Sequence, residues 1–466
     1  MDLIAILLPL GLLMLVAYRG YSVILFAPLC ALFGVLLTGA AWHVLPFHSS
    51  VFMATMADFV QKYFAVFLLG AVFGKVIELS GSAASISRSI VKLLGPKRAI
   101  PAIVLACAVL TYGGVSLFVV AFAVYPLAAS LFREAKLPKR LIPGTIALWS
   151  FTFTMDALPG TPQIQNIIPT TFFGSTVYAA PILGTLGAVL VLGCCLSYLQ
   201  RRARQAMVQG EGYGEGHLNE PEEGSPDAKM PKAWLAVHPL ALVAGVNWAL
   251  TRSIPTWYGE SFDFAAIGLP KFSAVKIANV VGIWSIEIAL LAGIAATLAI
   301  GYSRTVPTIK AGLTHAVGGA LLATMNTASE YGFGSVIASL AGFGAVKAAI
   351  GGVFAHPLVS LAVSVNVLAG ITGSASGGLG IALAALGKQY LEAAQAAGIS
   401  PEVLHRVASM ASGGMDTLPH NGAVITLLAI TGLTHKQSYR DIFALTAIKT
   451  AAVFVVIGFY VLTNLI

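Results

Sequence analysis

The sequence predicts an all-α, polytopic membrane protein made of two inverted repeats, and three observations lead to this prediction. Of the 466 residues, 57% are hydrophobic and 10% are charged, whereas a soluble chain carries about 25% charged residues. The mean hydropathy is +0.86. The pattern Met-Asp-x-Leu-Pro occurs at 155–159 and again at 415–419, each time inside an apolar segment. Helix-breaking motifs at matching places of two halves are typical of inverted repeats with discontinuous membrane helices.

The charge balance is explained by membrane topology. The net charge is +8 and the pI is about 9.3, but the basic residues lie in short connections between apolar segments, as expected for cytoplasmic loops. The four cysteines lie within apolar runs and have no metal-ligand spacing. We therefore expect the lipid bilayer as a partner, and we expect no nucleic acid, cofactor or metal.

The first half, residues 1–199, is predicted to contain five crossings and one re-entrant hairpin. The hairpin at 98–131 is interrupted at 111–116. Its arms of roughly 13–15 residues give about 20–22 Å of helix, less than the ~30 Å hydrocarbon core, so it enters and leaves on one side. The other expected elements are helices at 2–18, 21–41, 51–79 and 179–199, an amphipathic segment at 82–95, and a helix at 141–174 broken near 156–162.

Residues 200–233 are rich in charge, glycine and proline, which predicts a flexible cytoplasmic linker. The second half, 234–466, repeats the plan upside down, because each half has an odd number of crossings. Most of the 27 Lys and Arg residues then face inward, which places both termini in the periplasm of a bacterial inner membrane. The expected elements are helices at 235–250, 276–301, 311–340 (interrupted at 326–332) and 443–465, a hairpin at 348–388 with its tip at 372–378, and a broken helix at 404–433.

The two hairpin tips and the two broken-helix loops form the predicted binding site. Each break starts a half-helix whose unpaired N–H groups carry partial positive charge, which suits a carboxylate. Hydroxyl and amide side chains there bond carboxylate or hydroxyl oxygens, although the same side chains also serve as helix caps and packing contacts. The candidate substrate-binding residues are Thr111, Gly113, Gly114, Ser116, Asp156, Gly160, Thr161, Gln163, Thr372, Ser374, Ser376, Gly377, Asp416, His420 and Asn421.

Four ionisable side chains are candidates for holding a coupling ion or proton: Asp156, Glu330, Asp416 and His420. Ionisable residues inside a membrane are costly and mark functional sites. For the two aspartates the alternative is a structural cap on the following half-helix. Glu330 has no acidic counterpart in the first half and suits proton coupling, and its alternative is a protonated or hydrogen-bonded structural acid. His420 is a candidate because the ordinary pKa of a histidine is near neutrality, although a lone histidine is more often a packing residue.

Segment 70–81, the hairpin and the Asp-x-Leu-Pro break resemble the gluconate permease (GntP) family of the ion transporter superfamily. The resemblance covers nearly the whole chain outside 200–233. It implies a homodimeric, proton-coupled symporter of a small hydroxy-monocarboxylate, 3-hydroxybutyrate-like or gluconate-like, whose transport subdomain moves against a scaffold in the manner of an elevator. Gluconate carriers have a His-Gly-Phe-x-Pro-Pro-His-Pro type of break. This chain reads Met-Asp-Ala-Leu-Pro-Gly-Thr-Pro, which is more similar to the D-3-hydroxybutyrate permease branch.

Three other functions remain open from the sequence. Sodium coupling is the main alternative, because helix breaks of this kind also build cation sites. A passive channel would need no coupling group. An intramembrane aspartyl protease would use Asp156 and Asp416 as a proton-sharing dyad, but the Gly-x-Gly-Asp pattern of such enzymes is absent. We therefore do not expect an enzyme.

Overall fold

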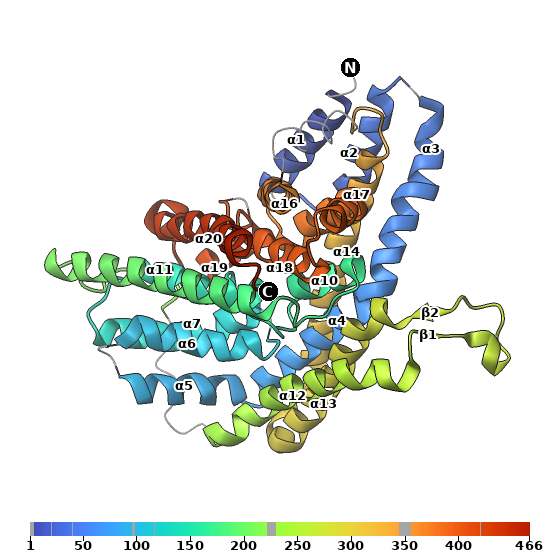
Figure 1. The fold of residues 1–466 in the computed structure, drawn as a ribbon. Helices are drawn as coiled ribbons and strands as arrows, with labels where there is room; N and C mark the ends of the chain where they lie inside the picture. Colours follow the sequence, from blue (N-terminus) through green and yellow to red (C-terminus); the bar gives the residue numbers. More distant parts are fainter. Residues whose placement is uncertain are drawn as a thin grey trace.

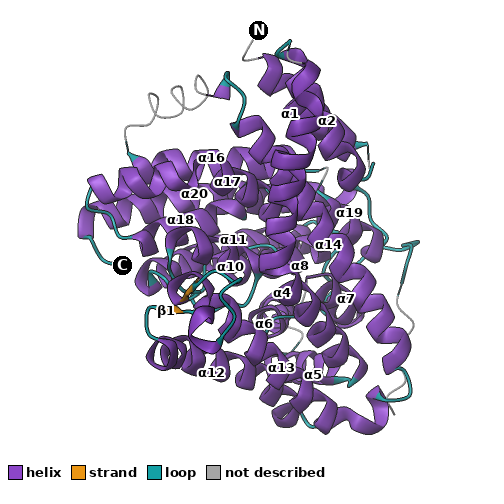
Figure 2. Ribbon diagram, turned by 90° about the vertical axis from the view of Figure 1, so that its right-hand side faces the viewer, coloured by secondary structure: helices purple, strands orange, loops and turns teal. Residues whose placement is uncertain are grey.

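The computed structural model describes residues 4–19, 21–39, 41–95, 98–115, 117–220, 230–343, 356–419 and 421–466. The predicted all-α membrane architecture is confirmed, since helices dominate these residues (Figure 2). Ser116 and His420 lie outside the described residues. Five helical segments of the described chain are long and apolar enough to cross a membrane: Ala41–Leu79, Pro181–Val208, Ala233–Tyr258, Ile277–Thr305 and His435–Thr463.

The first half contains the expected order of elements, ending in one long helix. Its helices are α1 (Ile4–Tyr18), α2 (Val23–Leu37), the continuous run of η1 (Ala41–His43), α3 (Val44–Pro46), η2 (Phe47–Phe52) and α4 (Met53–Leu79), then α5 (Ser82–Leu94), α6 (Ala99–Tyr112), α7 (Leu117–Glu134), α8 (Leu141–Ser150), α9 (Phe153–Asp156), α10 (Ile164–Phe173) and α11 (Pro181–Val208). The helix pair α6 and α7 is interrupted at the predicted tip, and α8 to α10 form the predicted broken helix.

The second half contains α12 (Ala233–Tyr258), η4 (Phe264–Ile267), α13 (Ile277–Thr305), α14 (Ile309–Ala338), α16 (Pro357–Thr372), α17 (Ala375–Ala396), α18 (Pro401–Ser412), α19 (Gly422–Thr431) and α20 (His435–Thr463). Two short strands, β1 (Ser261–Phe262) and β2 (Val275–Lys276), pair antiparallel with Ser261 opposite Lys276. Together with η4 they form an arm between α12 and α13 that the sequence analysis did not predict (Figure 1).

Local sequence explains where several of these helices start. The side chains of Ser374, Ser400 and Asn421 accept hydrogen bonds from backbone N–H groups in the first turns of α17, α18 and α19. Thr434 and Gln437 form a capping box at the start of α20. At the second hairpin tip, Gly373 ends α16 with a φ of +65°, a left-handed conformation that favours glycine.

The predicted interruption at 326–332 is wrong, because α14 runs without a break from Ile309 to Ala338. Small polar residues do not open this helix. Thr327 Oγ1 donates to the carbonyl of Ala323 one turn earlier, at 3.1 Å, which keeps the hydroxyl inside its own helix. Gly332 gives room for the neighbouring Phe52, whose ring and carbonyl lie where a side chain would project.

Helices from the two halves pack together in the interior. One group, which we call the α4–α14 group, consists of α1, α2, α4, α12, α13 and α14. In it, α4 packs on α13 and α14, α2 packs on α14, α1 packs on α2, and α12 packs on α13. The remaining helices, α5 to α11 and α16 to α20, form a second group that contains both hairpins and both broken helices (Figure 1).

Part of the predicted flexible linker is bound to other segments of the protein. Helix α11 continues to Val208, and residues 209–220, which we call the strap, are bound across the connection between α7 and α8. Glu220 pairs with Arg133 and, at 2.7 Å, with the buried Lys139. Arg140 binds both carboxylate oxygens of Glu211, at 2.6 and 2.7 Å. This part of the linker therefore has fixed contacts, contrary to its composition-based prediction.

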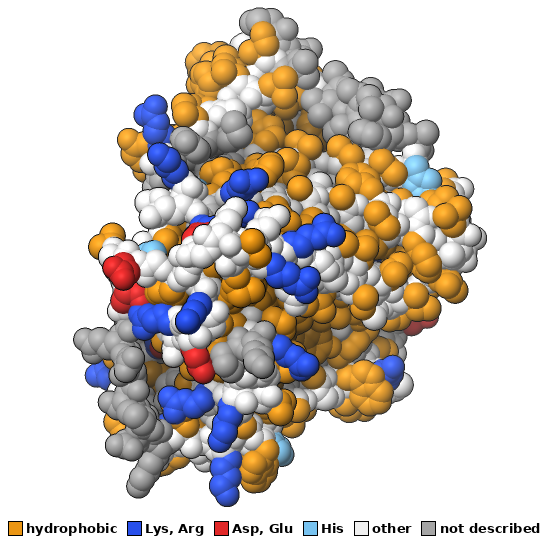
Figure 3. All heavy atoms as spheres, turned by 90° about the vertical axis from the view of Figure 1, so that its left-hand side faces the viewer, with side chains coloured by type: hydrophobic (Ala, Val, Ile, Leu, Met, Phe, Trp, Pro, Cys, Tyr) orange, Lys and Arg blue, Asp and Glu red, His pale blue; other side chains and the backbone are white. Residues whose placement is uncertain are grey.

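Asn219 extends the strap to a third helix. Its Nδ2 donates to the carbonyl of Ala429 on α19 at 2.7 Å, and its own carbonyl accepts from the hydroxyl of Tyr125 on α7 at 2.8 Å. Lys and Arg side chains are frequent on the face of the protein toward which the C-terminal end of α11 extends (Figure 3). A face of this kind has the charge expected of a cytoplasmic surface.

Candidate functional site

The first break is held by a buried arginine from the second half. All three guanidinium nitrogens of Arg406, on α18, donate to oxygen atoms. Nε and Nη2 reach the carbonyl of Ala179 at 3.1 and 2.8 Å, and Nη1 reaches Asn166 Oδ1 at 3.1 Å. Further bonds join Arg406 to the carbonyls of Asp156 and Val177. Arg406 thus ties the loop after Asp156 and the loop after α10 to α18.

Asn166 completes this connection. Its Nδ2 donates to the carbonyls of Thr161 and Val177, at 2.9 and 2.8 Å, which closes the loop at the first break. Its Oδ1 also lies 2.9 Å from His405 Nε2, and His405 Nδ1 lies 2.7 Å from Ser175 Oγ. Both His405 and Asn166 are fully buried. Asn166 therefore bonds neighbouring segments of the chain to one another.

The second break is held by a buried lysine from α20. Lys449 Nζ lies 2.6 Å from Asp416 Oδ1 and donates to the carbonyl of Phe151 at 3.0 Å. Phe151 lies two residues before the short helix α9. Lys449 therefore joins the loop of the second break to the start of the first, and the prediction that the two broken helices meet is consistent with this contact.

Asp156 lies near both of these cations. Its carbonyl accepts from Ser409 Oγ at 2.7 Å. Its carboxyl group lies against Gly413, where any side chain would overlap it. Lys449, Asp416 and Arg406 are all close enough to act on it electrostatically. Two carboxyl groups and two basic side chains therefore lie near one another in the interior.

Each hairpin tip contacts the break of its own half through an amide side chain. In the first half, Gln163 Nε2 donates to the carbonyl of Thr111 at 2.8 Å. In the second half, Asn421 Nδ2 donates to the carbonyl of Gly373 at 2.6 Å. Both residues stand at the N-cap position of the half-helix that follows the break. The predicted tips and breaks thus come together within each half.

Two hydroxyls at the first tip and break are buried without a partner in the described chain, Thr111 Oγ1 and Thr161 Oγ1. Buried polar atoms are normally hydrogen-bonded, so these two mark a place where a ligand or water would be stabilised. Gly160, with a φ of +81°, lies beside them and packs against Tyr178 and the Tyr112 hydroxyl. Thr372 at the other tip is different, since its hydroxyl bonds the carbonyl of Leu368 at 2.9 Å.

The second tip also contacts the α4–α14 group through Glu330. The carboxyl group of Glu330, on α14, lies against Gly377 in the first turn of α17. Nearby, Thr327 Oγ1 lies 3.3 Å from Ser376 Oγ. At the first tip the corresponding contacts are apolar, because Gly113 and Gly114 face Leu240 and Leu290. The two tips therefore differ in the chemistry that faces them.

The sequence analysis missed Arg406 and Lys449. From the topology alone, Arg406 was expected on or near the outer side of the membrane, but it is fully buried. Lys449 lies inside α20, which is long and apolar enough to cross a membrane. The rule that an ionisable residue within a membrane helix indicates a function or a partner would have identified it.

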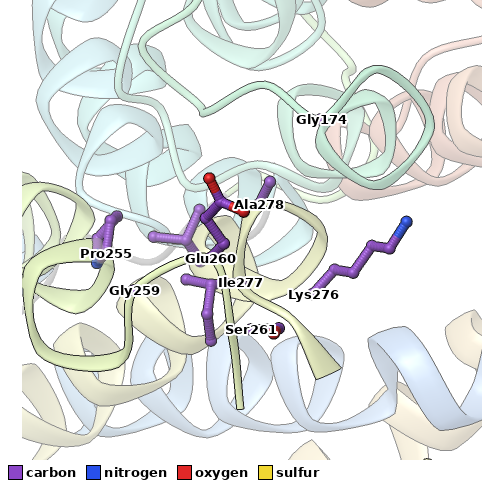
Figure 4. Close-up of a pocket in the computed structure, with 9 residues that line it drawn as sticks. Gly174, Pro255, Gly259, Glu260, Ser261, Lys276, Ile277 and Ala278 are labelled. Carbon is purple, nitrogen blue, oxygen red and sulfur yellow. The ribbon is translucent and has the colours of Figure 1, made fainter. Parts of the chain in front are cut away.

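One cavity of about 630 Å³ lies away from these residues (Figure 4). It opens where the end of α10 at Gly174 meets the arm and the first turn of α13, and the Lys276 side chain extends away from Glu260. No predicted site residue lines it.

Comparisons with known proteins agree with this architecture. A family described as GntP family permease matches residues 50–376. The uncharacterized transporter YxjC of Bacillus subtilis (strain 168) is 60% identical over 473 residues, which cover all of both chains. The structure of the Alcanivorax borkumensis YdaH transporter, described as having an unusual topology, is similar in fold, with a TM-score of 0.52 and 15% identity over 90% of this chain and 89% of that one. The chain is therefore a membrane transporter that belongs to the GntP family of permeases.

Proposed function

We propose that this permease is a secondary active transporter that carries a small hydroxy-monocarboxylate, similar to 3-hydroxybutyrate, together with protons. One observation supports the proposal most: Glu330 is a buried acid without an ion-pair partner in the described chain, and it faces the tip of the second hairpin. An intramembrane carboxyl group at a ligand site is a natural carrier of a coupling proton.

The chemistry around the second tip favours a ligand with one carboxylate and few hydroxyls. The free N–H groups at the start of α17 offer a place for one anion. Ser374, Ser376 and Thr327 add hydroxyl groups, and Ser329 Oγ is buried without a described partner. A polyhydroxylated acid such as gluconate would need more polar partners than these residues provide.

We further propose that the two halves are inverted repeats and that the second group of helices moves against the α4–α14 group as an elevator. Glycines line the boundary between the groups: Gly113 faces Leu240, Gly282 faces Thr170, and Gly377 faces Glu330. Small residues allow close helix approach in membranes and leave few interlocking side chains to oppose sliding. We also propose that the protein forms a homodimer through the α4–α14 group. In the same proposal both termini lie in the periplasm and the linker lies in the cytoplasm.

The ion pair between Asp416 and Lys449 disfavours the protease alternative. A proton-sharing dyad needs two carboxyl groups that compete for one proton, as in aspartic proteases. Asp416 instead pairs with a cation at 2.6 Å.

Uptake into proteoliposomes tests the proposal. Purified protein is reconstituted in sodium-free buffer, an inward proton gradient is imposed, and labelled 3-hydroxybutyrate is supplied with lactate, gluconate or succinate as competitor. We expect accumulation above the external concentration, competition by lactate, and counterflow exchange that a channel would not give. Uptake that requires sodium would replace proton coupling by the sodium alternative, and stronger competition by gluconate would move the substrate to sugar acids.

A further inference from the structure

Glu330 occupies an unusual position for a buried acid. It is 3% exposed, and in the described chain no donor reaches its Oε2. The carboxyl group lies so close to Gly377 that a methyl group there would overlap Oε2, and the hydroxyl of Ser374 borders the same spot at 3.0 Å from that methyl position. A carboxyl group from α14 therefore reaches the first turn of α17.

The start of α17 is suited to an anion. Ser374 caps the helix by accepting from the N–H of Gly377 at 3.0 Å, and the N–H of Gly378 bonds the carbonyl of Ser374 at 2.9 Å. The described residues provide no acceptor for the N–H groups of Ala375 and Ser376. Such groups at the start of a 22-residue helix carry partial positive charge and attract carboxylates.

No cation in the described chain neutralises Glu330. Asp58 and Lys62 on α4 pair with each other at 2.7 Å, and Lys388 and Glu392 on α17 form an exposed pair at 3.9 Å. The other ionisable groups on α14 and on the elements that pack against it do not bond Glu330 either. They are Cys30 on α2, His48 on η2, Tyr63, Lys75 and Glu78 on α4, Lys310, His315 and Tyr331 on α14 itself, and Tyr390 on α17. Within the described chain, the positive charge nearest to a Glu330 carboxylate is therefore the partial charge of the N–H groups at the start of α17.

Resting on the function proposed above, we propose that Glu330 occupies the position that the substrate's carboxylate takes, so that the two carboxylates compete for the start of α17. A proton that binds to the Glu330 carboxylate converts it to a neutral acid and releases the helix N-terminus to the substrate anion. One proton and one monocarboxylate enter the site together. Transport of a monoanion is then electroneutral, with one proton per substrate.

The test compares wild type with Glu330→Gln, a neutral side chain of the same shape, using 3-hydroxybutyrate as the probe. In wild type, the dissociation constant should rise by about tenfold per pH unit once Glu330 is ionised, because one proton is linked to binding. In Glu330→Gln it should be flat between pH 5.5 and 8. The variant should retain counterflow exchange and lose accumulation driven by the proton gradient, and wild-type uptake should not respond to an imposed membrane potential.

Glu392→Gln, on the exposed face of α17, is the matched control and should behave as wild type. Gly377→Ala is a second variant, since its methyl group displaces the Glu330 carboxyl group; it should weaken binding and flatten its pH dependence. The inference is overturned if Glu330→Gln keeps the wild-type pH dependence, fails to bind although folded, or still accumulates substrate. Failure of the proposed function is a separate result, because wild type itself would then show no proton-driven uptake.

Discussion

Lys449 and Asp416 form a buried ion pair that joins the last helix to the second break, with Nζ and Oδ1 2.6 Å apart and both side chains 4% exposed. The same ammonium group also donates to the carbonyl of Phe151 at 3.0 Å. One lysine therefore connects both broken helices. The cluster that it forms with Asp156 and Arg406 fixes the geometry of the breaks, whatever further part the aspartates have in transport.

Asp416→Asn and Lys449→Met should each be strongly destabilising, because either change leaves an uncompensated buried charge. The expected cost is about 3–5 kcal/mol. The double variant removes both charges and should regain most of the lost melting temperature, measured by thermal unfolding in detergent. We expect uptake to fall at least tenfold in each single variant and to recover in the double. A stable double variant without uptake would instead assign Asp416 to the transport site.

Asp156→Asn should also lower uptake by tenfold or more, equivalent to about 1.4 kcal/mol. The change removes the negative charge that lies near both Arg406 and Lys449, while the amide keeps the shape of the side chain. Asp263→Asn, on the exposed arm, provides a control with the same chemical change. Normal uptake by Asp156→Asn at normal expression would reduce Asp156 to a structural residue.

Much of the fold was predictable from the sequence because helix breaks in a membrane have a strong local signal. Gly373 with Ser374, and Asn421 after Pro419, stop one helix and start the next by local rules, and the structure breaks there. The content of polar residues alone predicted helix breaks less well. Asn326, Thr327 and Ser329 resemble a break in composition, but with no proline and with i−4 bonding of the hydroxyl the helix continues.

The long-range partners were not predictable. Glu330 and Gly377 come from different helices, and nothing in either segment indicates that they meet. The same holds for Arg406, because all but one of its acceptors are backbone carbonyls, which every residue has. The strap illustrates a further limit. Its glycine-rich, charged composition is typical of free linkers, but ion pairs with Arg133, Lys139 and Arg140 order it.

Arg406→Lys should lower thermal stability although it keeps the charge. Lysine has one donor nitrogen and cannot reproduce the planar set of bonds to Ala179, Val177 and Asn166. Carbonyls left unpaired in the interior cost about 1–3 kcal/mol each. The exposed Arg440→Lys is the control and should leave the melting temperature unchanged. Equal melting temperatures for the two variants would contradict the conclusion that the hydrogen bonds of Arg406 hold the two loops to α18.

Gly378→Ala should disrupt the second hairpin. A Cβ atom at this position would overlap the backbone of Ala369 and lie 2.6 Å from the carbonyl carbon of Leu368, so no side-chain rotation relieves the overlap. The expected cost is about 1–3 kcal/mol. Gly458→Ala, in α20, meets no atom within 4 Å and should stabilise the helix by about 0.5–1 kcal/mol. Thermal unfolding of the two variants side by side measures this difference.

The attachment of the strap should depend on pH. The hydrogen bonds from Arg140 lower the pKa of Glu211 below its ordinary value of 4.5. A carboxyl group whose pKa is lowered on folding stabilises the folded state above its ordinary pKa, and that contribution is lost as the pH falls through the lowered value. The strap should therefore be held at neutral pH and loosen in acid. Glu211→Gln should be loosened at every pH.

The attachment of the strap is measured by hydrogen exchange of residues 209–220. Exchange rates are expressed as protection factors, which removes the intrinsic effect of pH on exchange. Wild type should lose protection between about pH 5 and pH 3, while Glu211→Gln should be poorly protected already at pH 7. Glu215→Gln is the matched control, because Glu215 is exposed and forms no ion pair with the described residues. Protection that is equal in all three proteins at pH 7 would mean that Glu220, with Arg133 and Lys139, holds the strap without help from Glu211.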